Sequence, residues 1–198
     1  MARIEHILKS RKEYQCKKCG CVIEKGMGYF RANRIYQKPI IHCEDCGIKP
    51  YEVGNEYTQQ VGAISEEWRT TYGICEDAID SIISELEDIK SNEEEKLENL
   101  GENLRYSPNG EMFQERIDNL DTVISNLQEI DIDEMKDTEA ENFTASRDDN
   151  NIVSTYSELM EVIKDNEKDV ADFEKYLNNA IEEAIENALS DLEYWGGT

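Results

Sequence analysis

Cys16-Lys-Lys-Cys19-Gly20 and Cys43-Glu-Asp-Cys46-Gly47 are two copies of one motif, C-x-x-C-G, with 23 residues between Cys19 and Cys43. Two thiolates three positions apart on a tight turn can bind one metal ion. The glycine that follows allows backbone angles that point peptide N–H groups at the sulfurs. Four thiolates complete the tetrahedral coordination of Zn²⁺ and leave no open position. We therefore predict a structural zinc site formed by Cys16, Cys19, Cys43 and Cys46.

Two neighbouring residues are alternative ligands. Cys21 can replace Cys19, and His42 can replace one of the cysteines, although C-x-x-C-G is the better metal-binding turn. In a reducing compartment, paired cysteines of this kind are metal ligands or free thiols more often than disulfides. The alternative to a metal site is a chance cluster of free thiols. Cys75 lies on a helical seam, where we expect a core residue.

The residues around the two motifs indicate a small β module over residues 1–55. Residues 28–36 and 39–42 favour two short strands joined by a turn at 37–39. Two C-x-x-C-G turns on a hairpin resemble the zinc-ribbon class, whereas a helix directly after Cys46 would indicate a treble clef. The residues up to about Glu13 are expected to form a basic arm or a short helix.

The rest of the chain, residues 56–198, is expected to be helical. Only three prolines occur in the chain, and apolar residues recur at spacings of three and four. This seam predicts helices at about 58–104, 111–130 and 153–195, with a polar loop at 131–152. One apolar stripe on a long helix must be buried. The expected fold is therefore mainly α, an elongated antiparallel helical bundle or coiled coil preceded by the zinc-ribbon-like module.

Charge is distributed unevenly between these two parts. Residues 1–50 contain eleven Lys/Arg and five acids, a net charge of +6, and residues 51–198 contain ten Lys/Arg and forty acids, a net charge of -30. We expect the basic part and the acidic part to meet different partners. The acidic helices are either an ordinary solvated surface or a mimic of DNA that occupies a basic groove.

Basic and aromatic residues are interleaved around the predicted metal site. Phosphate groups attract Lys and Arg, and nucleic-acid bases stack on aromatic rings such as Tyr14, Tyr29, Phe30 and Tyr36. The alternative is that these rings form the core of a small module and that the basic groups are solvated or dock onto the acidic helices. The candidate nucleic-acid contacts are Lys17, Lys18, Lys25, Arg31, Arg34 and Lys38.

Catalytic motifs are missing from the sequence. The only histidines are His6 and His42, so neither HExxH nor a pair of ExxH motifs is present, and no Walker A, GxGxxG or GxSxG segment occurs. We expect a protein that is not an enzyme. The chain contains no apolar run long enough to cross a bilayer, and we expect a cytoplasmic protein with no membrane partner.

Several stretches resemble small proteins of bacteriophages and prophages that carry a zinc knuckle pair ahead of acidic helices. The stretches run from Arg11-Lys-Glu-Tyr14 to Gly26, from Cys43 to Pro50, and from Ser107 to Leu120. The resemblance implies a phage origin, with the cytoplasm of an infected bacterium as the site of action. By analogy, small acidic phage proteins act by binding host or defence proteins.

These observations favour a zinc-stabilised interaction protein that binds, and in this way inhibits, a host or defence protein acting on nucleic acid. The acidic helices would supply the main binding surface. A DNA- or RNA-binding accessory protein, dimerised by its helices, is the first alternative. A component of the virion or of its assembly is another, and a homodimer is compatible with all three.

Overall fold

The computed structural model describes residues 3–33, 38–146 and 153–192. These residues divide into two compact units, residues 3–63 and residues 64–192, and the division lies inside helix α1 (Glu56–Tyr72) instead of ahead of it. All strands of the described chain lie before residue 44, and its six α-helices follow. A mainly α protein with a small N-terminal β module is therefore confirmed.

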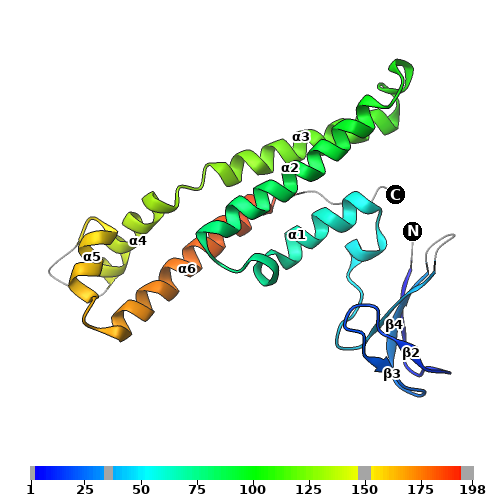
Figure 1. Ribbon diagram of the computed structural model, residues 1–198, viewed down its shortest axis with the longest axis horizontal. Coiled ribbons are helices and arrows are strands. Elements are labelled where there is room, and N and C mark those ends of the chain that lie inside the picture. Colours follow the sequence, from blue (N-terminus) through cyan, green and yellow to red (C-terminus); the bar gives the residue numbers. More distant parts are fainter. Residues whose placement is uncertain (1–2, 34–37, 147–152, 193–198) are drawn as a thin grey trace. The chain divides into compact units, whose positions relative to one another are not determined.

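The N-terminal unit contains two small antiparallel sheets (Figure 1). The first has the strand order β1-β4-β5, and the second pairs β2 with β3. The strands are β1 (Ile4–Ile7), β2 (Tyr14–Gln15), β3 (Val22–Ile23), β4 (Tyr29–Ala32) and β5 (Ile40–Cys43). The predicted strand pair corresponds to β4 and β5, while part of its turn lies outside the described residues.

A basic arm or short helix is expected at the start of the chain. For Ile4–Ile7 this expectation is wrong, because these residues form strand β1. Ile4 pairs with Ala32 and Ile7 pairs with Tyr29, so the segment is an edge strand of the first sheet. Ile7 also packs against the buried cluster that contains Cys16. Pairing with β4 thus gives this short segment the backbone partners that an isolated arm would lack.

A 3₁₀ turn, η1 (Pro50–Val53), leads from the sheets into α1. Tyr51 of this turn is buried against Gly62 of α1, where an added Cβ atom would collide with the side chain of Tyr51. The sequence presents Gly62 as a weak point of the helix because glycine lowers helix propensity. In the fold, the missing side chain instead makes room for Tyr51.

Helices α2 (Glu76–Glu98) and α3 (Pro108–Gln128) lie side by side and run in opposite directions within the second unit (Figure 1). The buried residues of this hairpin follow the predicted seam at Ile79, Ile82, Leu86, Ile89, Ile117, Leu120, Ile124 and Leu127. The predicted fold-back of the second helix onto the first is confirmed for α2 and α3. Coiled-coil geometry stays a prediction.

The single helix predicted for residues 58–104 is interrupted between Tyr72 and Glu76. Gly73 has a φ of 76°, and its N–H donates to the carbonyl of Arg69 over 3.2 Å. This is the usual way in which a glycine ends a helix. Cys75 is exposed at the N-cap of α2, so its expected place in the core is wrong.

The loop predicted for residues 131–152 is largely helical. Helix α4 covers Ile132–Ser146, and the carboxylate of Asp131 accepts hydrogen bonds from the backbone N–H groups of Asp133 and Glu134, each over 3.0 Å. Residues 147–152 of the predicted loop lie outside the described residues. The prediction failed because the acidic composition obscured both the cap and the apolar positions that α4 buries, among them Phe143.

The last predicted helix, 153–195, contains two separate helices. These are α5 (Tyr156–Ile163) and α6 (Glu167–Leu189), and residues 193–195 lie outside the described chain. The side chain of Asn166 accepts a hydrogen bond from the backbone N–H of Lys168 over 3.2 Å and caps α6. The capping residue starts a new helix at the point where the apolar pattern alone predicts an uninterrupted one.

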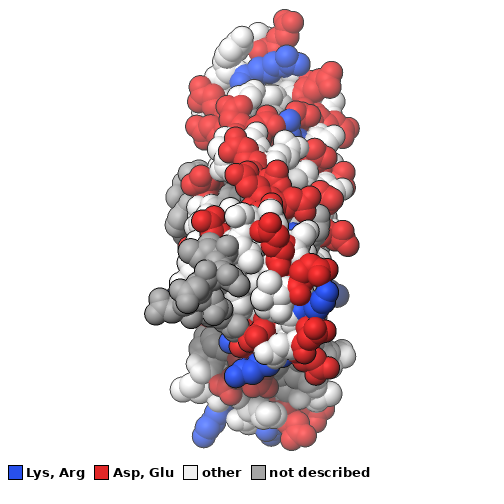
Figure 2. All heavy atoms as spheres, turned by 90° about the vertical axis from the view of Figure 1, so that its left-hand side faces the viewer, with Lys and Arg blue, Asp and Glu red and all other residues white. Residues whose placement is uncertain are grey.

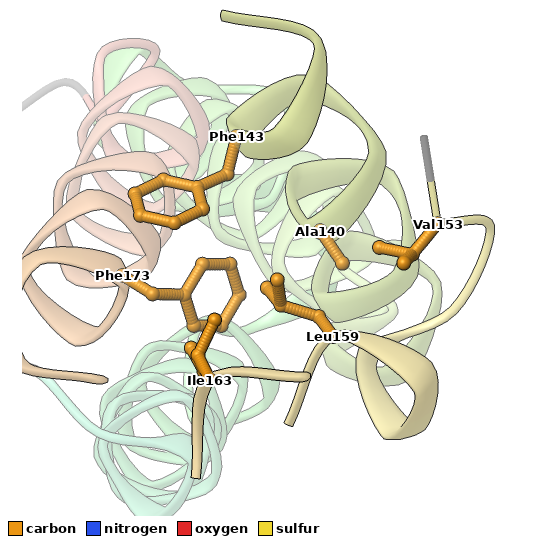
Figure 3. Packing of buried hydrophobic residues seen from close by; sticks show 6 residues of the cluster. All are labelled: Ala140, Phe143, Val153, Leu159, Ile163 and Phe173. Carbon is orange, nitrogen blue, oxygen red and sulfur yellow. The ribbon is translucent and has the colours of Figure 1, made fainter. Parts of the chain in front are cut away.

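A buried cluster of six residues holds α4, α5 and α6 together (Figure 3). Phe173 of α6 is its centre, and its ring meets the ring of Phe143 of α4 edge to face, with centroids 5.3 Å apart. The complete cluster consists of Ala140, Phe143, Val153, Leu159, Ile163 and Phe173. Two of these residues, Ala140 and Phe143, come from the segment that the sequence predicts as a loop.

Candidate metal centre

The two C-x-x-C-G motifs form the same turn twice. The N–H of Gly20 donates to the carbonyl of Cys16 over 3.0 Å, and the N–H of Gly47 donates to the carbonyl of Cys43 over 3.0 Å. Both glycines have positive φ, 75° and 62°, which residues with a side chain rarely adopt. The backbone angles expected of these glycines are therefore confirmed.

Five cysteine side chains gather where these turns meet. The sulfurs of Cys16, Cys19, Cys21 and Cys43 all lie within 4.8 Å of one another, and those of Cys19 and Cys43 are 3.7 Å apart. The side chain of Cys46 is not in this group, but it packs against the buried cluster that contains Cys16 and Cys43. The fold thus brings three of the predicted ligands, Cys16, Cys19 and Cys43, into one group with Cys21, and it places the fourth, Cys46, beside this group.

Backbone N–H groups favour the thiolate form of two of these cysteines. Burial would raise the pKa of Cys16, but hydrogen bonds from the backbone N–H groups of Cys19, Cys43 and Lys18 outweigh it and lower this pKa to about 6. The backbone N–H of Cys21 contributes most to lowering the pKa of Cys19. A metal ligand must be the thiolate, so this arrangement prepares both residues to bind a cation.

The thiols of Cys21 and Cys46 lie next to the other cysteines of the cluster, and this proximity disfavours their thiolate forms. Hydrogen bonding with Cys19 and Cys43 raises the pKa of the Cys21 thiol to about 12, and interactions with Cys43, Cys19 and Cys16 raise the pKa of Cys46. Both side chains keep their protons because further thiolates would repel those already present. A divalent cation removes this repulsion, so the donor set fits a thiophilic metal such as Zn²⁺.

His42 has a different role from the one considered in the sequence. Its buried ring places Nδ1 2.5 Å from the carbonyl oxygen of Gly47 and 3.7 Å from a carboxylate oxygen of Glu52. Within the described residues, the ligand atoms that lie close enough to share an ion are the sulfurs of Cys16, Cys19, Cys21 and Cys43, and no ring nitrogen of His42 is among them. His42 instead supports the backbone just after the second turn.

The candidate nucleic-acid contacts are spread over several elements of the module. Lys17 and Lys18 lie in the first C-x-x-C turn, Lys25 lies between β3 and β4, and Lys38 precedes β5; all four are exposed. The ammonium of Lys18 is 3.5 Å from a carboxylate oxygen of Glu52. Arg31 is half-buried in β4 and its Nε donates to the side chain of Asn33 over 2.9 Å, while Arg34 lies outside the described residues.

The aromatic residues of the module are used mainly for packing. Tyr29 is buried in one cluster with Cys16, Ile23 and Cys43, and its ring centroid lies 5.0 Å from that of Tyr14. Phe30 stacks on His6 with centroids 4.6 Å apart. Tyr36 lies outside the described residues. The rings of Tyr14, Tyr29 and Phe30 thus serve the interior and the sheet, as the second interpretation of these aromatics predicts.

Ser10 is a structural residue of the module that sequence reasoning missed. It is buried, its hydroxyl donates to the carbonyl of Glu24 over 2.6 Å, and the same oxygen accepts the N–H of Gly26 over 3.0 Å. Its backbone N–H donates to the carbonyl of Met27 over 2.8 Å. These hydrogen bonds fix the turn that leads into β4, and no local sequence motif predicts them.

Comparison of the chain with models of protein families, with curated proteins and with solved structures gives no match. In the described residues, none of the helices combines the length and the apolarity needed to cross a bilayer. The cysteine cluster and the uneven distribution of charge are the features of the chain that point to a function.

Proposed function

We propose that this chain is a zinc-stabilised interaction protein without catalytic activity. The observation that carries the proposal is the cluster of cysteine sulfurs within 4.8 Å of one another between two C-x-x-C-G turns. A site with four thiolate ligands leaves no coordination position for a substrate, so the ion acts on the fold. We assign the binding of a partner to the acidic helices, because the metal site takes part in no reaction.

In the proposed centre, Cys16, Cys19, Cys43 and Cys46 bind one Zn²⁺. Two turns of the same geometry supply them, and the N–H groups that lower the pKa of Cys16 favour the charged ligand. The zinc-ribbon class is supported by the β4–β5 pair, which ends at Cys43, and by the absence of an α-helix in the residues directly after Cys46, where η1 intervenes before α1.

The small interior of the module explains why an ion would be needed. The fully buried part of its cluster contains Cys16, Ile23, Tyr29 and Cys43, so two of its four members are the candidate ligands themselves. Modules of this size seldom bury enough apolar surface to fold alone, and a structural metal is a common remedy. The free energy of metal binding then becomes free energy of folding.

The acidic helices are the proposed binding surface. On the face in Figure 2, Asp and Glu side chains are far more abundant than Lys and Arg. Residues 51–198 carry a net charge of -30, which is well suited to a partner with a basic groove. We propose that this partner is a host or defence protein that acts on nucleic acid, and that the helices occupy its nucleic-acid site as a DNA mimic in a phage-infected bacterium.

A retention experiment with bacterial lysate tests this function. Full-length protein on a support is compared with the variants E87Q/D88N/E115Q and E87D/D88E/E115D, which change exposed side chains of α2 and α3. The first variant removes three charges and the second keeps them. We expect nuclease-resistant retention of a DNA- or RNA-acting protein, weakened by the neutral variant and by salt between about 50 and 200 mM.

Retention that is equal for the three proteins, or insensitive to salt, would refute the electrostatic mechanism. The zinc assignment has its own measurement, which is the metal content of the purified chain by mass spectrometry. One zinc per chain is expected. Treatment with a strong chelator should abolish the folded signal of the module, and added Zn²⁺ should restore it.

Direct binding of nucleic acid by the module is the second candidate, favoured by the exposure of Lys17, Lys25 and Lys38. The packing of Tyr14, Tyr29 and Phe30 leaves these rings poorly placed for base stacking. A gel shift with the full chain and with K17E/K25E/K38E distinguishes the two functions. A shift of duplex DNA that the substitutions abolish would support the module as the nucleic-acid site.

A further inference from the structure

We infer that the fourth sulfur ligand of the metal centre is interchangeable, so that Cys16, Cys19 and Cys43 bind the ion together with either Cys46 or Cys21. The inference rests on the zinc centre proposed above. It assigns a role to Cys21, the fifth cysteine near the centre, which lies outside the two C-x-x-C-G motifs. The thiol that does not bind the ion remains free beside it.

The positions of the sulfurs support this assignment. Cys16, Cys19 and Cys43 belong to both possible sets. Their sulfurs form one group with that of Cys21. Cys46 follows Cys43 in the second C-x-x-C-G turn and packs against the buried cluster that contains Cys16 and Cys43. With Zn–S bonds of about 2.3 Å, any two ligands of a tetrahedron lie about 4 Å apart. Four sulfurs within 4.8 Å of one another therefore need to move together by only about 1 Å to surround one ion.

The backbone holds Cys21 in place. Its carbonyl accepts the N–H of Cys16 over 2.8 Å, which closes the first turn onto residue 21. The next residues form β3, and Ile23 of that strand is 1% exposed in the interior of the module. Cys21 is therefore not on a loose segment that meets the cluster by chance. Cys46 lies in the second C-x-x-C-G turn, which the hydrogen bond from the N–H of Gly47 to the carbonyl of Cys43 closes.

Coordination chemistry prevents both thiols from binding at the same time. Zn²⁺ in a structural site takes four ligands, and three of these are common to both sets. Cys21 is exposed and Cys46 is half-buried, so the spare thiol is open to reagents in either state. A metal-loaded chain should therefore contain one reactive thiol at the centre, in addition to the exposed Cys75.

Cobalt substitution tests the inference, because Co²⁺ bound to thiolates has intense absorption bands that report tetrahedral coordination. The full-length protein is compared with C21S, C46S, C21S/C46S and C16S, and C75S serves as the control for a cysteine outside the cluster. We expect the tetrahedral tetrathiolate spectrum in the wild type, C21S, C46S and C75S. The double variant and C16S should lose it.

Alkylation of the zinc-loaded proteins with N-ethylmaleimide gives an independent count by mass spectrometry. We expect two modified thiols in the wild type, and only Cys75 in C21S and C46S. Helical circular dichroism confirms that the second unit is folded in each variant.

Loss of the cobalt spectrum in C46S but not in C21S, or in C21S but not in C46S, would overturn the inference, because one residue would then be indispensable. A wild-type protein that binds neither Co²⁺ nor Zn²⁺ would instead refute the proposed metal centre itself. The two failures are therefore distinguishable.

Discussion

Glu93 of α2 and Arg116 of α3 form a buried ion pair, in which the guanidinium donates to a carboxylate oxygen over 2.9 Å. The Glu93 side chain is only 1% exposed, and its other oxygen accepts the ammonium of Lys96 over 2.6 Å. A carboxylate that is removed from water in this way depends on its partners. This pair therefore links the two helices of the hairpin.

Removal of the arginine should destabilise the second unit strongly. Arg116→Ala leaves Glu93 buried without its interhelical partner, and we expect a loss of about 3–5 kcal/mol in the free energy of unfolding. Urea unfolding followed by helical circular dichroism measures it. Lys96→Ala is the matched control, because Lys96 binds the same carboxylate from a more exposed position, where an ion pair contributes about 0–1 kcal/mol. Equal losses in the two variants would contradict the prediction.

Phe173→Ala should destabilise the group formed by α4, α5 and α6. Phe173 is fully buried, and its ring contacts Phe143 and Tyr156. Truncation of a buried phenylalanine costs about 3–5 kcal/mol. Val162→Ala, which shortens an exposed side chain of α5, should change stability by less than about 0.5 kcal/mol in the same urea experiment. A small effect of Phe173→Ala would mean that the cluster repacks.

Gly62→Ala tests a packing contact against a local preference. Alanine in a helix interior is favoured over glycine by about 1 kcal/mol, so propensity alone predicts stabilisation. The Cβ would collide with Tyr51, however, and forced overpacking costs about 1–3 kcal/mol. We expect net destabilisation in thermal unfolding, whereas Gly101→Ala, with no atom within 4 Å of its new Cβ, should be close to neutral. A more stable Gly62→Ala variant would contradict the contact.

Tyr72 should resist ionisation at alkaline pH. Burial, together with a hydrogen bond from its hydroxyl to Glu85, raises the pKa of Tyr72 above its ordinary value of 10.0. Because the folded-state pKa is the higher one, this stabilisation is complete below pH 10 and is lost as the pH rises further. Urea unfolding at pH 9 and pH 11 should show a smaller decline for Tyr72→Phe than for the wild type. Identical declines would show that Tyr72 titrates normally.

Local sequence patterns predicted much of this structure. The C-x-x-C-G motifs predict turns that are closed by hydrogen bonds between residues close in sequence. The N–H groups of Gly20 and Gly47 make hydrogen bonds of this kind. The seam of α2 and α3 is also local, because spacings of three and four place Ile82 and Leu86 on one face. Both features could be predicted because the sequence itself fixes the geometry.

Features that depend on distant contacts or on caps could not be predicted in the same way. The sequence suggests Cys21 only as a replacement for Cys19. In the structure, β3 and the turn at Cys16 place Cys21 in one group with Cys19, which no spacing rule requires. The helix over residues 132–146 is supported by α6 through Phe143, and its acidic composition resembles that of a loop. Asn166 is a residue type that caps helices, but the apolar spacing of three and four, on which the prediction was based, gives no sign of a break at this point.

The five clustered cysteines all lie before η1 and α1 in the chain. During translation, the ribosome therefore makes every sulfur of the centre before it makes the first acidic helix. Domains generally fold as units during synthesis, the N-terminal one first. Metal capture by the nascent chain would then take place before the forty carboxylates of residues 51–198 exist to compete for the cation. In the proposed zinc centre, the order of the two parts along the chain would thus give the thiols first access to the ion.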